Sequence, residues 1–343
     1  MNRRTFLQLL AGAAAASPFS SGRASSDSLG AVLPRRPLGA SGPQVTCLGL
    51  GGYHIGWTTE DLARATIEAA LEEGVRFFDT AESYGPHISE ERYGRYLTPR
   101  YRDEIFLMTK SQAKTAAAAR RAIEDSLRRL ATDRVDLWQF HSLETPEDVD
   151  ARLAGGVLEE ALKAQAEGKI ASIGFTGHAS PYAHLRLLER TGGDSSPFLT
   201  CQFPVNPVDA ASPHSFITRV LPEAQKSGLG CIAMKTLADG RFFARKQVGE
   251  RTVWESANPV VPGAVSLSDC IHFALSLPIA TLVTGAENPA FLREKAVLTR
   301  SFHQMDETAR RAVIDRVAGY AREGKVEYYK ARALREPDPA SAG

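Results

Sequence analysis

The sequence predicts a single-domain α/β fold, a (β/α)8 or TIM barrel, and two observations carry this prediction. From residue 45 onward, short apolar runs typical of buried strands alternate with longer amphipathic segments, and no linker divides the pattern into two domains. This alternation favours parallel strands joined by helical crossovers. An open doubly wound sheet has the same order of elements, but the eightfold count favours closure into a barrel.

The expected elements can be placed by residue number. The strands are expected at residues 45–50, 75–79, 105–109, 135–140, 172–175, 199–203, 230–234 and 281–284. Helix-like segments lie between them, for example at residues 59–73, 115–130, 157–167, 215–226 and 266–276. Gly74, Gly168 and Gly228 each end such a segment just before a strand, where a left-handed residue often caps a helix. The barrel domain is expected to span residues 31–330, with a last helix at 307–323 and a Pro/Ala-rich tail at 331–343.

The first thirty residues read as a segment of another kind. Arg3 and Arg4 stand directly before an apolar run at residues 6–16, and a Ser/Gly/Ala-rich stretch follows. A basic start, a short apolar middle and small residues at the cleavage region are typical of a secretory signal. The paired arginines resemble the twin-arginine signal. We therefore expect residues 1–30 to be a signal peptide and flexible segment, the twin-arginine export machinery to be a partner, and the mature protein to be periplasmic.

Composition excludes several classes of partner. The formal net charge is +1, which gives no general attraction to nucleic acid or to an anionic membrane. No stretch of about twenty apolar residues is present, so no stable membrane span is expected in the mature form. The four cysteines have no CxxC spacing and the histidines form no ligand pattern, so no metal site is expected. Free thiols are favoured, although pairing of Cys201 with Cys231 stays open.

Four polar residues follow neighbouring strands at the end where barrel active sites form. Asp79 and Tyr84 follow the second strand, Lys110 the third, and His141 the fourth. A lysine ammonium lowers the pKa of a nearby phenol, and an aspartate can hold that lysine charged. Tyr84 can then act as a general acid toward a carbonyl oxygen, while His141 donates a second hydrogen bond to it.

The runs that contain these residues resemble the aldo/keto reductase family. Asp79-Thr80-Ala81-Glu82-Ser83-Tyr84-Gly85 is similar to its aspartate–tyrosine motif. Residues 106–110 (FLMTK) resemble its lysine strand and residues 136–141 (DLWQFH) its histidine strand. The resemblance covers roughly residues 35–305. It implies hydride transfer between a nicotinamide cofactor and a small-molecule carbonyl substrate, reducing an aldehyde or ketone to an alcohol or the reverse, with Asp79, Tyr84, Lys110 and His141 as a catalytic tetrad.

The resemblance also implies a set of cofactor-binding residues, although several depart from the family pattern. Where the family carries a Ser-Asn pair for the nicotinamide carboxamide, Thr176 keeps a hydroxyl but Gly177 has no side chain to offer. Where the family has an aromatic-Ser-Pro-Leu run, this sequence has Met234-Lys235-Thr236-Leu237. The expected cofactor-binding residues are Thr176, Gln202, Met234, Lys235, Leu237, Gly285, Glu287 and Lys295.

The choice between the two nicotinamide cofactors stays open, with NADP slightly favoured because it is the usual cofactor of the family that the sequence resembles. Glu287 stands where the family often has an arginine for the 2′-phosphate. A carboxylate repels that phosphate and can bond the ribose hydroxyls of NAD instead. Arg293 and Lys295 are near enough in sequence to restore the positive charge.

The sequence leaves a second class of function open. A nicotinamide-cofactor-binding sensor or regulatory module with little turnover would suit the altered positions at Gly177 and Met234. A hydrolase or isomerase on the same barrel is disfavoured, because neither a metal-ligand cluster nor a catalytic carboxylate pair is present. Tyr53, Trp57, Trp254, His54 and His87 are candidates for the substrate mouth, and the long connection at residues 238–262 is a candidate lid.

Overall fold

Eight parallel strands close into a barrel in the computed structural model, which describes residues 25–192, 196–242, 245–248, 251–255, 261, 263–322, 324 and 326–330. The order around the barrel follows the sequence, and the last strand pairs with the first to close it. The strands are β5 (Leu48–Gly51), β6 (Phe77–Asp79), β7 (Phe106–Ser111), β8 (Leu137–Phe140), β9 (Ile173–Thr176), β10 (Phe198–Pro204), β11 (Gly230–Met234) and β14 (Thr281–Gly285). The predicted fold class is therefore confirmed.

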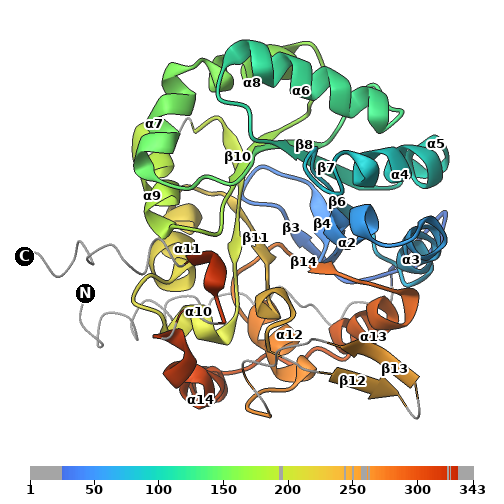
Figure 1. Cartoon of the computed structure of the whole chain (residues 1–343), viewed down its shortest axis with the longest axis vertical. Coiled ribbons are helices and arrows are strands. Elements are labelled where there is room, and N and C mark those ends of the chain that lie inside the picture. Colours follow the sequence, from blue (N-terminus) through green and yellow to red (C-terminus); the bar gives the residue numbers. More distant parts are fainter. Residues whose placement is uncertain are drawn as a thin grey trace, which may run out of the picture.

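Helices form an outer ring around these strands (Figure 1). The longer ones are α3 (Glu60–Glu72), α4 (Ile88–Tyr96), α6 (Ala116–Arg129), α7 (Pro146–Ala154), α8 (Val157–Ala166), α9 (Pro181–Thr191), α11 (Phe216–Lys226), α12 (Leu267–Leu275), α13 (Pro289–Arg300) and α14 (Glu307–Val317). Short helices α2 (Gly52–Trp57), α5 (Thr98–Tyr101) and α10 (Pro207–Ala211) lie in the connections. Gly74, Gly168 and Gly228 have φ of 78°, 75° and 69°, the left-handed values expected after a helix.

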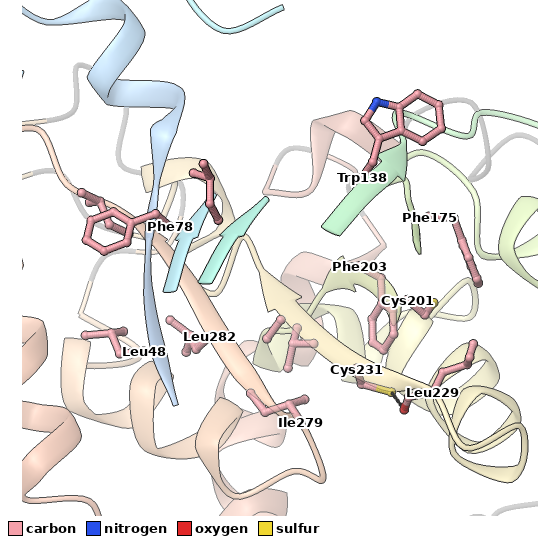
Figure 2. Close-up of a cluster of buried hydrophobic side chains, with 14 of the residues drawn as sticks. Leu48, Phe78, Trp138, Phe175, Cys201, Phe203, Leu229, Cys231, Ile279 and Leu282 are labelled. Atoms are coloured by element: carbon pink, nitrogen blue, oxygen red, sulfur yellow. Dashed lines mark hydrogen bonds between the residues drawn. The ribbon is translucent and has the colours of Figure 1, made fainter. Parts of the chain in front are cut away.

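Two apolar layers stabilise the barrel. One lies between strands and helices and contains large buried side chains such as Phe78, Trp138 and Phe203 (Figure 2). The other fills the interior of the barrel at the N-terminal ends of the strands and includes Phe77 and Leu137. This floor leaves the opposite end, where the strands finish, free for polar side chains.

A hairpin covers the floor of the barrel. Strands β3 (Arg35–Pro37) and β4 (Gln44–Thr46) pair antiparallel, and Leu38 between them packs into the inner layer. A Cβ on Gly39 would lie 2.6 Å from the backbone nitrogen of Gly230, so the hairpin approaches the barrel closely only with glycine there. The single strand expected at residues 45–50 is thus two strands, divided at Cys47, because its first half belongs to this hairpin.

Two further hairpins were not expected from the sequence. Strands β1 (Ser25–Asp27) and β2 (Gly30–Val32) pair across residue 30, the expected end of the flexible N-terminal segment. Arg76 holds this hairpin on the barrel, because its guanidinium donates to both carboxylate oxygens of Asp27 at 2.8 and 2.9 Å. Strands β12 (Arg245–Val248) and β13 (Arg251–Glu255) form the other hairpin, which lies beside α13 (Figure 1).

Some expectations fall outside the described residues. Arg3, Arg4 and the tail at 331–343 lie there, so the export signal and the tail stay predictions. The candidate lid is described only in part, and it stays a prediction as well. Within the part of the chain that the structure covers, none of the helices has the length and apolar character needed to cross a membrane. Cys47, Cys201, Cys231 and Cys270 are free, buried thiols.

Candidate active site

A cleft of about 500 Å³ opens where the barrel strands end. The predicted site residues that line it are Asp79, Tyr84, His141, Thr176, Gln202, Met234, Lys235, Leu237, Gly285, Glu287 and Lys295. Lys110, from the end of β7, does not line the cleft but contacts two residues that do. The structure thus brings all of the predicted residues together at one site.

Lys110 is buried and holds three oxygens at once. Its ammonium is paired with the Asp79 carboxylate, donates to the backbone oxygen of Thr80 at 2.8 Å, and donates to the Tyr84 hydroxyl at 3.2 Å. Burial favours the neutral amine, but Asp79 and then Tyr84 outweigh it, so the pKa of Lys110 lies above its ordinary value. Lys110 is therefore a fixed positive charge beside the phenol.

The pKa of Tyr84 differs from the sequence expectation. We expected the lysine to lower it, and Lys110 does act in that direction. Burial has the larger effect and Asp79 adds to it, so the pKa of Tyr84 lies above its ordinary value. The phenol is consequently protonated at neutral pH, which is the form that a proton donor requires.

His141 lies beside the Tyr84 ring in an edge-to-face arrangement. The two ring centres are 5.7 Å apart, with an angle of 82° between the planes. Burial, followed by the charge of Lys110, holds the pKa of His141 well below its ordinary value, so the imidazole is neutral. Arg152 fixes the end of β8 by donating to the backbone oxygen of His141 at 2.9 Å. A neutral imidazole next to the phenol can donate a hydrogen bond to a substrate oxygen without adding a charge.

Two buried side chains hold Gln202, one through its side-chain amide and one through its backbone oxygen. Gln139 donates from its side-chain nitrogen to Oε1 of Gln202 at 2.9 Å, and a ring nitrogen of His184 lies 3.2 Å from the Gln202 backbone oxygen. Both supporting side chains are fully buried. The Gln202 amide is thus fixed at the base of the cleft.

Polar and charged groups follow the last two strands. Lys235 has a φ of 52° and pairs with Asp239 at 3.4 Å. Lys295 is buried, donates to Thr284 Oγ1 and the Gly285 oxygen at 2.7 and 2.6 Å, and lies 3.8 Å from the centre of the Phe291 ring. These residues place positive charge along one side of the cleft.

His54 and Glu287 face each other at the same end of the cleft. Their closest side-chain atoms are 3.6 Å apart, and the Glu287 side chain is 44% exposed. Partial burial raises the pKa of the Glu287 carboxyl, and Lys295 offsets part of the rise. A Cβ on Gly285 would lie 2.3 Å from Nδ1 of His54, so this packing requires glycine. His54 thus contacts the glycine turn after β14, and His87 does not line the cleft.

The C-terminal segment forms a wall of the cleft that the sequence did not predict. Tyr328 and Tyr329, in the short helix η4 (Tyr328–Lys330), line the cleft. The Tyr328 hydroxyl donates to Asp239 at 2.5 Å, and Lys235 lies 4.8 Å from the centre of the Tyr329 ring. The wall is therefore joined to the turn after β11.

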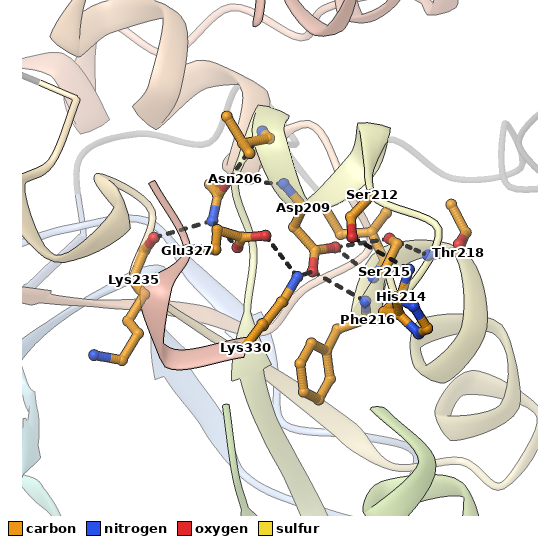
Figure 3. A network of polar contacts seen from close by, with 12 residues as sticks. Asn206, Asp209, Ser212, His214, Ser215, Phe216, Thr218, Lys235, Glu327 and Lys330 are labelled. Atoms are coloured by element: carbon orange, nitrogen blue, oxygen red, sulfur yellow. Dashed lines mark hydrogen bonds and ion pairs between the residues drawn. The ribbon is translucent and has the colours of Figure 1, made fainter. Parts of the chain in front are cut away.

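A buried polar network fixes this wall (Figure 3). Lys330 is paired with Asp209 and with Glu327, the latter at 2.7 Å. Asn206 and the hydroxyl of Tyr329 each donate to Oε1 of Glu327 at 2.8 Å. No pattern in the sequence links Lys330 to Asp209, which lies 121 positions earlier.

Comparison with known proteins decides the family. The sequence model of the aldo/keto reductase family matches residues 47–286, more than half of the chain. The chain belongs to the aldo/keto reductase family. It is an enzyme, an oxidoreductase that interconverts carbonyl and alcohol groups with a nicotinamide cofactor. The sensor with little turnover is not favoured, because named dehydrogenases are among its relatives.

Two sugar dehydrogenases are among the relatives. The chain is 30% identical to the L-galactose dehydrogenase of Arabidopsis thaliana over 242 residues, 67% of this chain and 72% of the relative. It is 31% identical to a D-threo-aldose 1-dehydrogenase of a Pseudomonas species over 172 residues, 40% of this chain and about half (51%) of the relative.

Solved aldo-keto reductases share the fold. The holo form of an aldo-keto reductase from Bacillus halodurans has a TM-score of 0.64 and 23% identity, covering 82% of this chain and 95% of its own. The glycerol dehydrogenase of Gluconobacter oxydans has a TM-score of 0.62 and 22% identity, covering 83% and 95%.

The cleft of this aldo/keto reductase fits a nicotinamide cofactor, with one departure that the structure explains. A Cβ at position 177 would lie 2.5 Å from the Leu143 backbone oxygen and 2.9 Å from the His184 ring, so this backbone excludes the asparagine side chain that the family usually carries. Of the two amide side chains that the family usually places beside the nicotinamide, only Gln202 is therefore present in this cleft. Thr236 also lines the cleft, next to the cation Lys235. Its buried hydroxyl has no hydrogen-bond partner among the described residues. A hydroxyl donor beside a lysine suits a phosphate group of the cofactor.

Of the two candidates for restoring positive charge near Glu287, Arg293 does not line the cleft. It pairs with Glu72 at 2.8 Å and with Glu73 at 3.6 Å. The reason is helix geometry, because positions two apart on α13 point about 200° apart and cannot share a face. Lys295 faces the cleft, and so Arg293 faces α3. No group of three or more potential metal-ligating residues is present among the described residues.

Proposed function

We propose that Asp79, Tyr84, Lys110 and His141 are the catalytic tetrad of this enzyme and that Tyr84 is the proton donor. The bound nicotinamide supplies or accepts the hydride. In reduction, the Tyr84 hydroxyl gives its proton to the substrate oxygen, and neutral His141 donates a hydrogen bond to the same oxygen as charge develops there. In oxidation, the phenolate form of Tyr84, stabilised by the Lys110 ammonium, takes the proton from the alcohol. The observation that supports this assignment best is the contact of Tyr84 with the buried Lys110–Asp79 pair.

We further propose that the substrate is an aldose, oxidised at its hemiacetal carbon. Two observations support this class. Two relatives are an L-galactose dehydrogenase and a D-threo-aldose 1-dehydrogenase. The cleft also exposes hydroxyl and amide side chains beside the tetrad, namely Ser83, Gln112 and Ser142. Such groups bond to the several hydroxyls of a sugar and would be left unpaired by a plain aldehyde.

A substrate panel tests the proposal. Initial rates are compared for aldoses and for simple alcohols and aldehydes of similar size, in both reaction directions. We expect kcat/KM to be at least tenfold higher for the best aldose. Equal kcat/KM for an unsubstituted aldehyde would rule out the sugar assignment and leave the tetrad assignment standing.

We also propose that NAD rather than NADP is the preferred cofactor, although the resemblance to the family slightly favoured NADP. Glu287 lines the end of the cleft, Arg293 is engaged by α3, and Lys295 is occupied by Thr284 and the Gly285 oxygen. Each of these observations disfavours a 2′-phosphate and suits a free ribose hydroxyl. Titration of the purified protein with both reduced cofactors, followed by fluorescence quenching, tests this preference.

Export by the twin-arginine route is a separate proposal, which rests on the sequence alone. Arg3 and Arg4 precede the apolar run, and the receptor reads the paired guanidinium groups. Replacing both by lysine should abolish or greatly slow periplasmic accumulation while the cytoplasmic pool stays folded and active. Undiminished export of the double variant would refute the assignment.

A further inference from the structure

Gln139 is a polar residue inside the barrel, two residues before His141 of the proposed tetrad. It lies on β8 in register with Lys110 of β7 and with Gly174 of β9, and it is fully buried. Beneath it, Met108 and Leu137 belong to the apolar floor. Burying an amide costs free energy unless hydrogen bonds compensate for the lost contact with water.

The hydrogen bond from Gln139 selects one orientation of the Gln202 amide. The side-chain nitrogen of Gln139 donates to Oε1 of Gln202 at 2.9 Å, so the NH2 group of Gln202 is turned away from Gln139. Burial raises the pKa of the Asp79 carboxyl, and the charge of Lys110, followed by hydrogen bonds from Lys110 and Gln202, opposes the rise. A carboxylate only accepts hydrogen bonds, so it is the NH2 group of Gln202 that can serve Asp79.

The opposite orientation of Gln202 is disfavoured at both ends. Rotating the amide by a half-turn would place its oxygen against the Asp79 carboxylate and its NH2 group against the NH2 group of Gln139. In the observed orientation, Gln202 keeps one N–H and one oxygen lone pair free. A primary carboxamide such as that of nicotinamide needs one acceptor and one donor, so the free groups match it.

Gly174 makes the room for this arrangement. A Cβ at that position would lie 2.1 Å from Thr200 Oγ1 and 3.1 Å from Gln139 Oε1. Position 174 therefore excludes any other side chain, and the space goes to Gln139 and Thr200.

We propose that Gln139 is a positioning residue for the cofactor: it locks the Gln202 amide in the orientation that both supports Asp79 and presents the carboxamide-binding groups. The inference rests on the proposed role of Gln202 in cofactor binding. It makes Gln139 part of the site although it does not line the cleft.

The test is a double-mutant cycle on cofactor affinity. Gln139→Leu removes the donor and suits the apolar floor. The loss of one net hydrogen bond corresponds to about a three- to tenfold rise in the Kd of reduced cofactor, measured by fluorescence quenching. In a Gln202→Leu background, Gln139→Leu should cause no further rise, because its effect passes through Gln202.

Thr200→Val is the matched control. Thr200 is as buried as Gln139, and the two residues stand in register with Gly174 from the strands on either side of it. The Thr200 hydroxyl has no hydrogen-bond partner among the described residues. This variant perturbs the same barrel layer but should leave the Kd unchanged. Equal Kd values for Gln139→Leu and Thr200→Val, or equal effects of Gln139→Leu in both backgrounds, would overturn the inference.

Gln139→Glu adds a readout that a merely structural role would not give. Its protonated carboxyl can donate to Gln202, whereas its ionised form cannot. The Kd of this variant should approach the wild-type value at low pH and rise with pH more steeply than that of wild type. A pH profile parallel to wild type would contradict the proposal. Failure of the wild-type protein to bind either nicotinamide cofactor would instead overturn the proposed function itself.

Discussion

The ammonium of Lys110 lies 3.2 Å from the hydroxyl oxygen of Tyr84 and 4.6 Å from the centre of its ring. The contact stabilises the phenolate that forms when the proton leaves. In the resting site, burial and Asp79 outweigh this effect and keep the phenol protonated. Tyr84 therefore holds a proton in the resting cleft, and Lys110 stabilises the negative charge that remains on the phenol oxygen once the proton is transferred.

The first prediction concerns Tyr84→Phe, which removes only the hydroxyl. General acid catalysis contributes about a hundred- to ten-thousand-fold, so single-turnover hydride transfer should fall by that range. Cofactor affinity should stay nearly unchanged, because the ring is retained. A variant that binds cofactor and transfers hydride at the wild-type rate would defeat the assignment of Tyr84.

The second prediction concerns Lys110. Lys110→Met alone leaves the buried Asp79 carboxylate without its cation, so the double variant with Asp79→Asn is the cleaner test. Hydride transfer should fall by a factor comparable to that of Tyr84→Phe. Adding Tyr84→Phe should cause little further loss, because residues that act as a unit are strongly non-additive. Multiplicative losses would show that Lys110 acts independently of the phenol.

The third prediction concerns Glu287→Arg. If the carboxylate faces the adenosine ribose, the change should strengthen NADP binding relative to NAD. An ion pair at this partly exposed position is worth about 1 kcal/mol or less, which corresponds to up to about fivefold in the Kd ratio. Arg293→Gln is the control, because Arg293 pairs with α3 outside the cleft and should leave the ratio unchanged. An unchanged ratio in Glu287→Arg would place that side chain away from the ribose.

The barrel and the convergence of Asp79, Tyr84, Lys110 and His141 at one end of it were predictable for the same reason. Buried parallel strands are short apolar runs, and the polar residues that end them, such as Asp79 and His141, converge wherever the strands close. The three hairpins escaped prediction because short polar strands such as β1 carry no such signal. Whether Arg293 or Lys295 faces the cleft depends on which face of α13 packs against the barrel. Their closeness in sequence does not determine that face.

The pKa of Tyr84 was misjudged because burial, unlike the neighbouring charge, cannot be read from a motif. The Tyr328–Tyr329 wall was missed for a different reason. It is held by Lys330 and Asp209, two charges that look like ordinary surface residues until the fold buries both.

The fourth prediction concerns acid stability. Burial lowers the pKa of His184 to about 4, and this histidine is fully buried. The unfolded chain takes up a proton as the pH falls below about 6.5, whereas the folded protein does so only near pH 4. The stability that neutral His184 contributes is therefore complete above pH 6.5 and declines by about 3 kcal/mol as the pH falls to 4.

His184→Leu tests the sign of this effect. Urea unfolding between pH 7 and pH 4 should show a shallower decline in the free energy of unfolding than in wild type. Some decline should remain, since burial also lowers the pKa of His54 and of His178 to about 4. An identical slope in the variant would mean that His184 titrates in the folded protein as it does in the unfolded chain.

The fifth prediction concerns the C-terminal wall and Lys330. Lys330→Met leaves the Asp209 and Glu327 carboxylates buried without their shared cation, which typically costs about 3–5 kcal/mol of folding free energy. Asp209 keeps its bonds from Ser215, Phe216 and Ile217, so the lower end of that range is expected.

The wall should also loosen in this variant, because Glu327 holds the Tyr329 hydroxyl. We expect KM for the substrate to rise at a temperature where the variant is still folded. Lys226→Met is the matched control, since its pair with Glu223 is exposed and should change stability by less than about 1 kcal/mol. If both variants unfold at the same urea concentration as wild type, the Lys330 network does not secure the wall. A large loss of stability with an unchanged KM would show instead that Tyr329 is held by its ring contacts with His178 and Lys235 rather than by Glu327.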